Sequence, residues 1–340
     1  MEEMGRRREY TEGKLNSLRG ELSESKKICE ERACVYATGS FGRSEANEYS
    51  DLDLFIVGYP LYTEAANGYS DQPKQQERKL NNLDEIIVKS ELIKATKELN
   101  LPDFDGDGEY LRHYTCKELV QYLGSPDDDN KNTFTARLLL LLESKPVIGE
   151  NVYDNIVKDV IKAYWRDYKD HKDEFVPTYF VNDVLRLWRT FCVNYEARTR
   201  TDPEKDKLKR RVKNYKLKHN RMLTCFSAVL YLLHIHKNAG TVHPQDLREM
   251  VKRPPIERLD WVRRESQPSS SIQNQIQDLL QAYESFLEKS KNGTDGLIEK
   301  FNCNEIYKEY INEAIEFGDK MALSLSESGG NSKLYRHLIV

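Results

Sequence analysis

The sequence lacks the features of a membrane protein or of a disulfide-rich secreted protein. Its apolar runs fall well short of the about 18 residues that cross a bilayer. The six cysteines among 340 residues are scattered and form no C-x-x-C pair, a spacing that fits neither a zinc knuckle nor a disulfide framework. The first residues, 1–9, are charged and no apolar segment comes after them. We therefore expect no signal peptide, reduced thiols and a cytoplasmic protein.

The chain also lacks an excess of positive charge. It carries 52 Lys and Arg against 56 Asp and Glu, a net charge of −4. Any contact with nucleic acid must then come from a local patch, and we do not expect DNA or a membrane as a partner. Although 32% of the residues are charged, the 11 Phe, 20 Tyr and 3 Trp exclude a disordered chain.

Strand patterns occur only in the N-terminal third of the chain. Short β-branched and aromatic runs predict strands at residues 34–38 and 52–57, and apolar periodicity predicts helices at 10–33 and 76–99. Further predicted helices cover residues 115–123, 132–144, 151–169, 178–198, 205–237, 244–252, 272–290 and 303–325. We therefore expect an α+β protein, with a small α/β domain that contains a mixed sheet at residues 1–130 and a mainly α-helical domain at 131–340.

A Gly-Ser pair closes the first predicted strand, in the stretch T-G-S-F-G-R-S-E. Gly39 would let backbone amides approach phosphate oxygens with no side chain in the way. Ser40 adds a hydroxyl donor, and the start of a following helix favours an anion. This pair alone is typical of an ordinary turn, so it indicates a phosphate site only in combination with a second motif.

Ten residues after Ser40, the stretch S-D-L-D-L opens the second predicted strand. The two-residue pleat of a strand would put the carboxylates of Asp51 and Asp53 on one face and Leu52 on the other, in the core. Two acids on one face repel unless a cation lies there. Paired carboxylates are ligands that Mg²⁺ prefers, and a nucleoside triphosphate would share the metal.

The spacing of these two parts resembles the DNA polymerase β-like nucleotidyltransferase superfamily, in which Gly-Ser is followed some ten residues later by Asp-apolar-Asp. The version here looks closest to the bacterial branch that contains PII uridylyltransferase and glutamine synthetase adenylyltransferase. Residues 134–146 and 181–189 are also similar to that branch. The resemblance covers about residues 30–235, and residues 1–130 would form the polymerase β-like domain.

The resemblance implies a nucleotidyltransferase that depends on Mg²⁺, with Mn²⁺ as an alternative metal. It would transfer a nucleoside monophosphate from a nucleoside triphosphate, ATP in the first place, to an acceptor hydroxyl and release pyrophosphate. The acceptor could be a protein, an RNA or a small molecule, and an oligomer is compatible with the sequence. Catalysis and metal binding fall to Asp51 and Asp53. The residues expected to bind the nucleotide are Gly39, Ser40, Arg43, Ser50 and Lys216.

Members of this superfamily commonly add a third carboxylate from a neighbouring strand. The candidates here alternate in the stretch D-F-D-G-D-G-E-Y, which begins at Asp103, and for the metal site we single out Asp105 or Asp107. In an extended chain these acids would share a face. A loop with no catalytic part is the competing interpretation.

Two helical segments beyond the motif carry cations. Residues 205–221 hold nine Lys and Arg against one Asp. They form either a solvated face or a surface, including Lys216, that neutralises a triphosphate or RNA. On the predicted helix 178–198, Asn182, Arg186 and Arg189 lie together. They either line a nucleotide or acceptor pocket or form a polar strip on the surface.

Two alternative functions remain at this stage. One is a catalytically weak, nucleotide-binding regulatory protein, because the third acid is in doubt. The other is a ribonuclease of the HEPN type, because Arg166 and His171 match an Arg-x4-His pattern whose two residues lie on one helix in that family.

Overall fold

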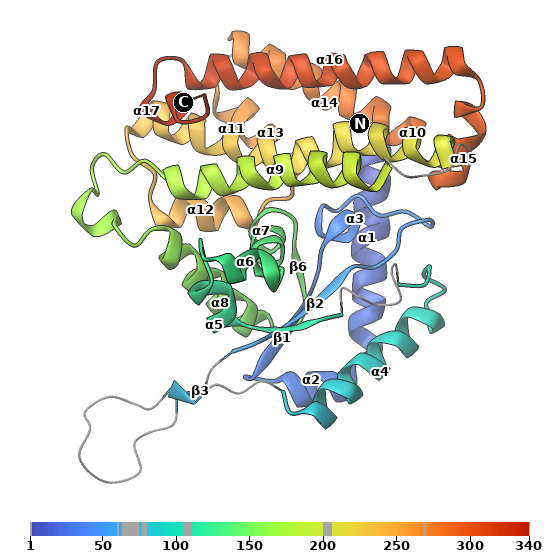
Figure 1. Ribbon diagram of the computed structural model, residues 1–340, viewed down its shortest axis with the longest axis vertical. Helices are drawn as coiled ribbons and strands as arrows, with labels where there is room; N and C mark the ends of the chain where they lie inside the picture. The colour runs from blue at the N-terminus through green and yellow to red at the C-terminus, as the bar shows by residue number, and fades with distance from the viewer. Residues whose placement is uncertain are drawn as a thin grey trace. The chain divides into compact units, whose positions relative to one another are not determined.

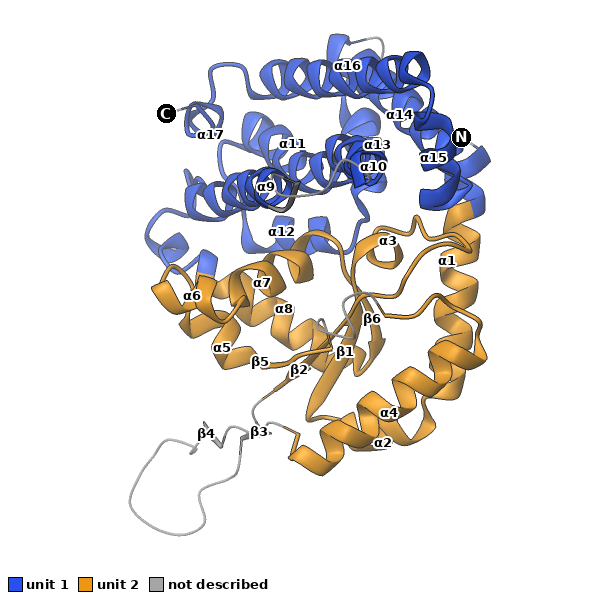
Figure 2. Ribbon diagram, turned by 45° about the vertical axis from the view of Figure 1, so that its right-hand side comes forward, with its two compact units in different colours: residues 1–6, 164–340 blue, residues 7–163 orange. Residues whose placement is uncertain are grey.

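The computed structural model describes residues 2–59, 61–62, 75–76, 80–104, 111–199, 206–267 and 270–339. The chain divides into two compact units, shown in different colours in Figure 2. Residues 7–163 form what we call the α/β unit, and residues 1–6 with 164–340 form the helical unit.

The α/β unit has a mixed sheet with the strand order β5-β2-β1-β6. β1 lies between β2 and β6 and is antiparallel to both, whereas β5 is parallel to β2. Its elements, in chain order, are α1 (Glu2–Glu21), α2 (Ser23–Cys29), β1 (Ala33–Ala37), α3 (Gly39–Gly42), β2 (Leu54–Gly58), β3 (Leu61–Tyr62), β4 (Gln75–Gln76), α4 (Asn82–Glu98), β5 (His113–Thr115), α5 (Cys116–Gln121), α6 (Pro126–Asn130), α7 (Thr133–Leu142), β6 (Lys145–Ile148) and α8 (Glu150–Tyr164). β3 and β4 pair with each other as a separate ribbon.

Helices cover both faces of this sheet. In Figure 1, α1, α2 and α4 lie on one side of it, and α5, α7 and α8 lie on the other. The first face packs alternate strand residues such as Val35 and Ile56 against Leu18 of α1 and Leu92 of α4. Because both faces are buried, β2 is apolar at nearly every position, as the sequence L-F-I-V shows.

The second face of the sheet is held by aromatic side chains. Tyr36 of β1 stacks on Phe55 of β2, with 5.5 Å between the ring centroids. Tyr153 of α8 meets Tyr36 edge-on at 6.0 Å, and Tyr114 of β5 contacts Phe55 at 6.1 Å. Offset and edge-on ring contacts of this kind add to the burial of apolar area. Together the two layers fix the strand ends that carry the motif.

The helical unit is built around α11, which is buried along most of its length. α11 packs against α9, α13 and α16, and α14 packs against α13 and α16. Its elements are a 3₁₀ turn (Tyr168–Asp170), α9 (Thr178–Thr199), α10 (Lys207–Lys216), a π-helical turn (Leu217–Arg221), α11 (Met222–Ala239), α12 (Pro244–Val251), α13 (Pro255–Glu265), α14 (Ser271–Lys289), α15 (Gly293–Phe301), α16 (Asn304–Gly329) and α17 (Lys333–Arg336).

A buried histidine lies in the aromatic core of the helical unit. His219, in the π-helical turn, stacks on Phe286 at 4.3 Å and on Phe317 at 5.1 Å. Its Nδ1 lies 3.0 Å from the carbonyl oxygen of Tyr215. Burial lowers the pKa of His219 from its usual 6.5 to about 4. The ring is therefore neutral at neutral pH and behaves as part of the apolar core.

The structure confirms the predicted α+β class, with a mixed sheet near the N-terminus and helices after it. The predicted strands at 34–38 and 52–57 correspond to β1 and β2. β5 and β6 were not predicted, because they are short and, in β6, interrupted by Pro146. Pairing of β6 with β1 extends the α/β unit past residue 130, the predicted domain boundary, to residue 163. The functional division at 130 stays a prediction.

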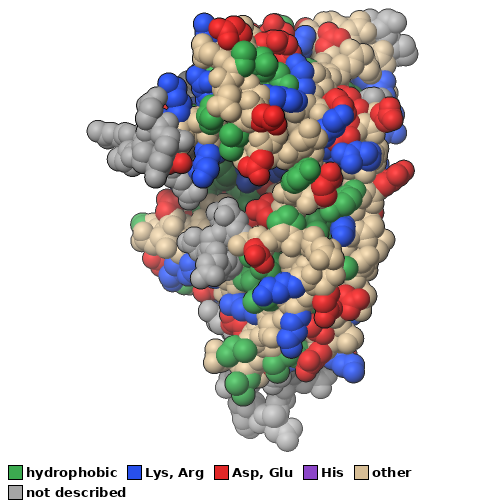
Figure 3. Space-filling model, turned by 90° about the vertical axis from the view of Figure 1, so that its right-hand side faces the viewer, with side chains coloured by type: hydrophobic (Ala, Val, Ile, Leu, Met, Phe, Trp, Pro, Cys, Tyr) green, Lys and Arg blue, Asp and Glu red, His purple; other side chains and the backbone are tan. Residues whose placement is uncertain are grey.

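The surface carries both signs of charge. On the face seen in Figure 3, Lys and Arg side chains alternate with Asp and Glu side chains rather than gathering in one patch of a single sign. Among the described residues, no helix has the length and apolar character that a membrane span requires.

Candidate active site

The two halves of the motif meet at one end of the sheet. β1 and β2 are antiparallel, with Ala37 opposite Leu54. The pairing continues one step further, where the amide of Thr38 donates to the carbonyl oxygen of Asp53 over 2.9 Å. The end of β1 and the start of β2 therefore lie side by side, and the loop between them places Gly39 against Asp53.

Gly39 occupies a position that is strained for any residue with a Cβ. Its φ is +63°, in the left-handed region that side chains with a Cβ rarely adopt. A Cβ at this residue would also lie 2.7 Å from Oδ2 of Asp53. The Asp53 carboxylate thus lies close to Gly39, at the start of the Gly39–Gly42 turn.

Asp51, Leu52 and Asp53 precede β2 and show the predicted alternation of burial. Leu52 is 1% exposed and belongs to the core cluster of the α/β unit, with Leu54 and Ile56. The flanking residues Asp51 and Asp53 are half-buried. Their alternation with a buried leucine agrees with two carboxylates on the side away from the core.

The two serines of the motif have different surroundings. Ser40 is half-buried, in the first turn of α3, and its carbonyl oxygen accepts from the amide of Glu45 over 2.8 Å. Ser50 belongs to the turn before Asp51. Its hydroxyl accepts from the Asn47 amide over 3.0 Å and lies 3.1 Å from Asn47 Oδ1. The contacts of Ser50 therefore fix the turn that leads into the acidic pair.

Arg43 lies beneath the Gly39–Gly42 turn in a buried network of ion pairs. Its Nε donates to Glu45 and its Nη1 donates to Glu143, each over 2.8 Å. Arg43 is 4% exposed, Glu45 2% and Glu143 1%. These contacts join the turn to the end of α7. The nucleotide-binding role predicted for Arg43 stays a prediction, and these two bonds are to protein carboxylates.

Gly42 brings the same turn against the end of α7. A Cβ on Gly42 would lie 2.0 Å from the carbonyl oxygen of Glu143, and backbone atoms cannot yield as a side chain can. The two glycines of the pattern G-S-F-G-R-S-E therefore have different neighbours. Gly39 lies against Asp53, and Gly42 lies against the end of α7. Sequence reasoning missed the roles of Glu45 and Glu143, although both stand in the stretches that carry the family resemblance.

A second buried ion pair joins α7 to α6. Arg137 forms a bidentate pair with Asp128 of α6, at 2.9 and 2.5 Å, and both side chains are fully buried. Arg137 also donates to the carbonyl oxygen of Leu119 over 3.0 Å, and Thr133 donates to Asp128 over 2.7 Å. Because every group is hydrogen-bonded, this cluster positions α5, α6 and α7 relative to one another.

Asp105 and Asp107 were predicted as metal ligands, and Lys216 was predicted to bind the nucleotide. Asp105 and Asp107 lie outside the described residues. In the described part of the chain, Asp103 is exposed, and no group of three or more His, Cys, Asp or Glu side chains is close enough to hold a metal ion. Lys216 is on α10 of the helical unit, where its Nζ donates to the hydroxyl of Thr294 over 2.9 Å.

The Arg166–His171 pattern does not lie on one helix, and that part of the prediction is wrong. α8 ends at Tyr164, and a 3₁₀ turn at residues 168–170 separates the two side chains. Arg166 contacts the ring of Tyr179 at 5.6 Å. The predicted helix 151–169 ends early because Trp165 turns into the core of the helical unit, where its Nε1 donates to the carbonyl oxygen of Val242.

The buried cysteines are not suited to nucleophilic chemistry. Burial raises the pKa of Cys29 and of Cys116 to about 12, and it also raises the pKa of Cys34 well above its usual value. The six cysteines are unpaired, in agreement with the reduced thiols expected from their spacing.

No curated protein and no solved structure matches the chain. A family model does match: residues 15–101 correspond to the one described as a nucleotidyltransferase domain. That range contains β1, the Gly39–Ser40 turn, the Asp51–Asp53 pair and β2. The narrower resemblance to the PII uridylyltransferase branch stays a prediction. In the part of the chain that forms this end of the sheet, the protein is therefore similar to nucleotidyltransferase domains and carries both halves of their motif.

Proposed function

We propose that the protein transfers a nucleoside monophosphate, AMP in the first place, from a nucleoside triphosphate to an acceptor hydroxyl. The observation that carries this proposal is the position of Asp53 beside Gly39, where a Cβ would lie 2.7 Å from Oδ2 of the carboxylate. A carboxylate that we propose as a metal ligand therefore lies close to the turn that we propose as the phosphate site. The match of residues 15–101 to the nucleotidyltransferase domain supports the same reaction class.

In this proposal the Gly39–Ser40 turn holds the triphosphate through backbone amides and the Ser40 hydroxyl. We infer that the ion pairs of Arg43 with Glu45 and Glu143 restrict the movement of this turn. Rigid donors contribute more to catalysis than mobile ones, since they need no reorganisation as charge develops.

Asp51 and Asp53 fit a Mg²⁺ ion in their chemistry. They offer hard carboxylate oxygens, and Mg²⁺ in proteins is commonly held by one or two carboxylates together with substrate phosphates and water. When bound, the metal would neutralise charge on the triphosphate and on the leaving pyrophosphate. We propose that Asp105 or Asp107 adds a third carboxylate, since both stand shortly before β5, the parallel neighbour of β2.

The reaction itself is an in-line displacement. The acceptor oxygen forms a bond to the α-phosphorus, the bond from that phosphorus to the bridging oxygen breaks, and pyrophosphate leaves. An aspartate of the pair takes the proton of the acceptor hydroxyl. Positioning and electrostatics account for most of the rate in such transfers. We also propose that the reaction takes place in the cytoplasm, a location that unpaired cysteines and a triphosphate substrate support.

Pyrophosphate release tests the proposal. The wild type and the variants Asp51→Asn and Asp53→Asn are given Mg²⁺, each of the four triphosphates in turn and a host lysate as acceptor. We expect release with ATP and a loss of about 100-fold or more in each variant. Asp127→Asn is the matched control, since Asp127 is a half-exposed acid of the same unit on α6.

Three outcomes of this assay decide between the candidate functions. Release that depends on both aspartates supports the transfer reaction. Release that the substitutions leave unchanged contradicts it. Binding of ATP without any release overturns the enzyme proposal in favour of a regulatory protein that binds nucleotide. Far-UV circular dichroism checks that each variant keeps its fold.

A further inference from the structure

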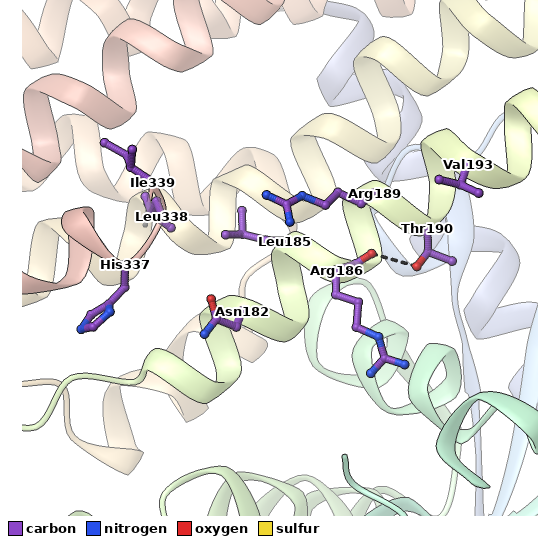
Figure 4. A pocket seen from close by; sticks show the side chains of 9 residues that line it. All are labelled: Asn182, Leu185, Arg186, Arg189, Thr190, Val193, His337, Leu338 and Ile339. Carbon is purple, nitrogen blue, oxygen red and sulfur yellow. Dashed lines mark hydrogen bonds between the residues drawn. The ribbon is translucent and has the colours of Figure 1, made fainter. Parts of the chain in front are cut away.

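A second site lies in the helical unit, on the exposed face of α9. There the helix and the segment after α17 enclose a pocket of about 490 Å³, which we call the α9 pocket (Figure 4). This volume lies within the range of small-molecule sites. The pocket is lined by Asn182, Leu185, Arg186, Arg189, Thr190, Val193, His337, Leu338 and Ile339. The α9 residues among these recur at a spacing of three and four, so they share one face of the helix.

The polar part of the pocket is cationic. Its lining includes two arginines and no carboxylate among the described residues. Arg186 already has an acid near it, since its Nη1 lies 3.8 Å from Oδ1 of Asp183. That acid is buried and accepts a hydrogen bond from Tyr164 over 2.7 Å, which holds it in place.

Arg189 differs from Arg186 in its direction and its surroundings. In Figure 4 its guanidinium extends along α9 toward Leu338, whereas that of Arg186 projects to the other side of the helix. Arg189 is exposed, and it has no ion pair or hydrogen bond through its guanidinium to the described residues. It is therefore the cation available to a ligand in the α9 pocket.

The rest of the pocket is apolar. Leu185 and Leu338 are half-buried, while Val193 is 64% exposed and Ile339 is 70% exposed. Large apolar side chains gathered at a concave site indicate a ligand with an apolar body. A nucleic-acid backbone would use cations and gain little from such a surface. The combination of one available guanidinium and an apolar wall fits a small ligand better.

We propose that the α9 pocket binds a small amphiphilic organic anion. Its carboxylate or phosphate group is held by Arg189, and its alkyl or aryl body packs against Leu185, Leu338 and Ile339. The Asn182 carboxamide offers a further donor at the rim. All the residues that form this pocket belong to the helical unit.

Isothermal titration calorimetry of the full chain, without nucleotide or metal, tests the proposal. The probes are octanoate and octyl phosphate, with octanol and inorganic phosphate as controls that each carry only half of the expected features. We expect both octyl anions to bind with a stoichiometry of one, and both controls to bind at least about tenfold more weakly. Such a gap corresponds to the loss of one charge-assisted hydrogen bond or of the apolar contact.

Two arginine variants of the helical unit assign the binding to the pocket. Arg189→Gln should weaken the binding of the octyl anions about tenfold or more. The control Arg264→Gln should change their affinity less than about threefold, because Arg264 is an exposed arginine of α13 that does not line the pocket. Equal binding of inorganic phosphate, several ligands per chain or an unaltered Kd in Arg189→Gln would each overturn the proposal. The proposal would also be overturned if an RNA oligomer bound through Arg189 and the octyl anions did not bind.

Discussion

Replacing Arg43 by methionine removes the cation that holds two buried carboxylates beneath the Gly39–Gly42 turn. The structure gives Arg43 two charge-assisted hydrogen bonds of 2.8 Å, one to Glu45 and one to Glu143. All three residues are at most 4% exposed, so solvent screens the pairs little. Breaking a buried pair from one side costs about 3–5 kcal/mol, since the remaining charges keep their desolvation penalty.

Hydrogen exchange measures this loss where it occurs. We expect the protected amides of β1 and β2 to exchange about two to four orders of magnitude faster in Arg43→Met than in the wild type. The exchange rate in Arg43→Lys should lie between those of the wild type and Arg43→Met, because one ammonium group cannot replace a guanidinium that bonds to two carboxylates. Unchanged exchange in Arg43→Met would refute the positioning role, since the ion pairs would then contribute nothing to the turn.

The variant Glu143→Gln distinguishes two roles of Arg43: holding the Gly39–Gly42 turn in position, or binding the nucleotide directly. If Arg43 bound the triphosphate itself, removal of a competing anion would leave ATP affinity equal or higher. In our account the substitution replaces the ion pair with Glu143 by a bond from Arg43 to a neutral amide, and only the pair with Glu45 remains. The Kd for ATP therefore rises several-fold, in the same direction as in Arg43→Met. Tighter ATP binding in Glu143→Gln would contradict the account.

Three further outcomes are expected from particular contacts. Gly39→Ala should abolish nucleotide transfer, because its Cβ would displace the Asp53 carboxylate and φ at this residue is +63°. Gly13→Ala in α1, where a Cβ meets open space, should keep activity and gain about 1 kcal/mol of stability. Pyrophosphate release measures the activity of both variants, and urea unfolding measures their stability. The pKa of His219 falls from 6.5 to about 4 on folding, so the unfolded state takes up the proton first. Stability should then drop by about 3 kcal/mol as the pH falls from neutral to 4. Tryptophan fluorescence, which reports the helical unit, should show a smaller drop in His219→Gln. Arg137→Met should destabilise the α/β unit by about 3–5 kcal/mol in urea, because it leaves a fully buried carboxylate on α6; a loss below about 1 kcal/mol would show that the pair is dispensable.

The sequence predicts the parts of this fold that depend on local patterns. β1 and β2 are apolar runs bounded by turns, and the placement of Gly39 and the Asp51–Asp53 pair is explained by their positions at the strand ends. β5 and β6 are too short to show a pattern of their own. Each becomes a strand because it pairs with a neighbour, β5 with β2 and β6 with β1. These pairings join residues that are far apart in the chain, so local sequence patterns do not reveal them.

The role of Arg43 shows the same limit at the site. From the sequence, a cation beside a Gly-Ser turn is most simply a phosphate ligand. The structure pairs it with Glu143, a hundred residues further on, which reaches the turn because β6 returns beside β1. The helical break at Leu217–Arg221 escaped prediction as well, since its apolar periodicity continues through the π-helical turn.

The most direct test of the central claim uses ATP labelled at the α-phosphorus and, in parallel, at the γ-phosphorus. If the protein transfers a nucleoside monophosphate, the α-label becomes attached to an acceptor while the γ-label appears in pyrophosphate. Both signals then disappear in the double variant Asp51→Asn/Asp53→Asn. An α-label that stays in free nucleotide, or that is transferred equally well by the double variant, would contradict the account.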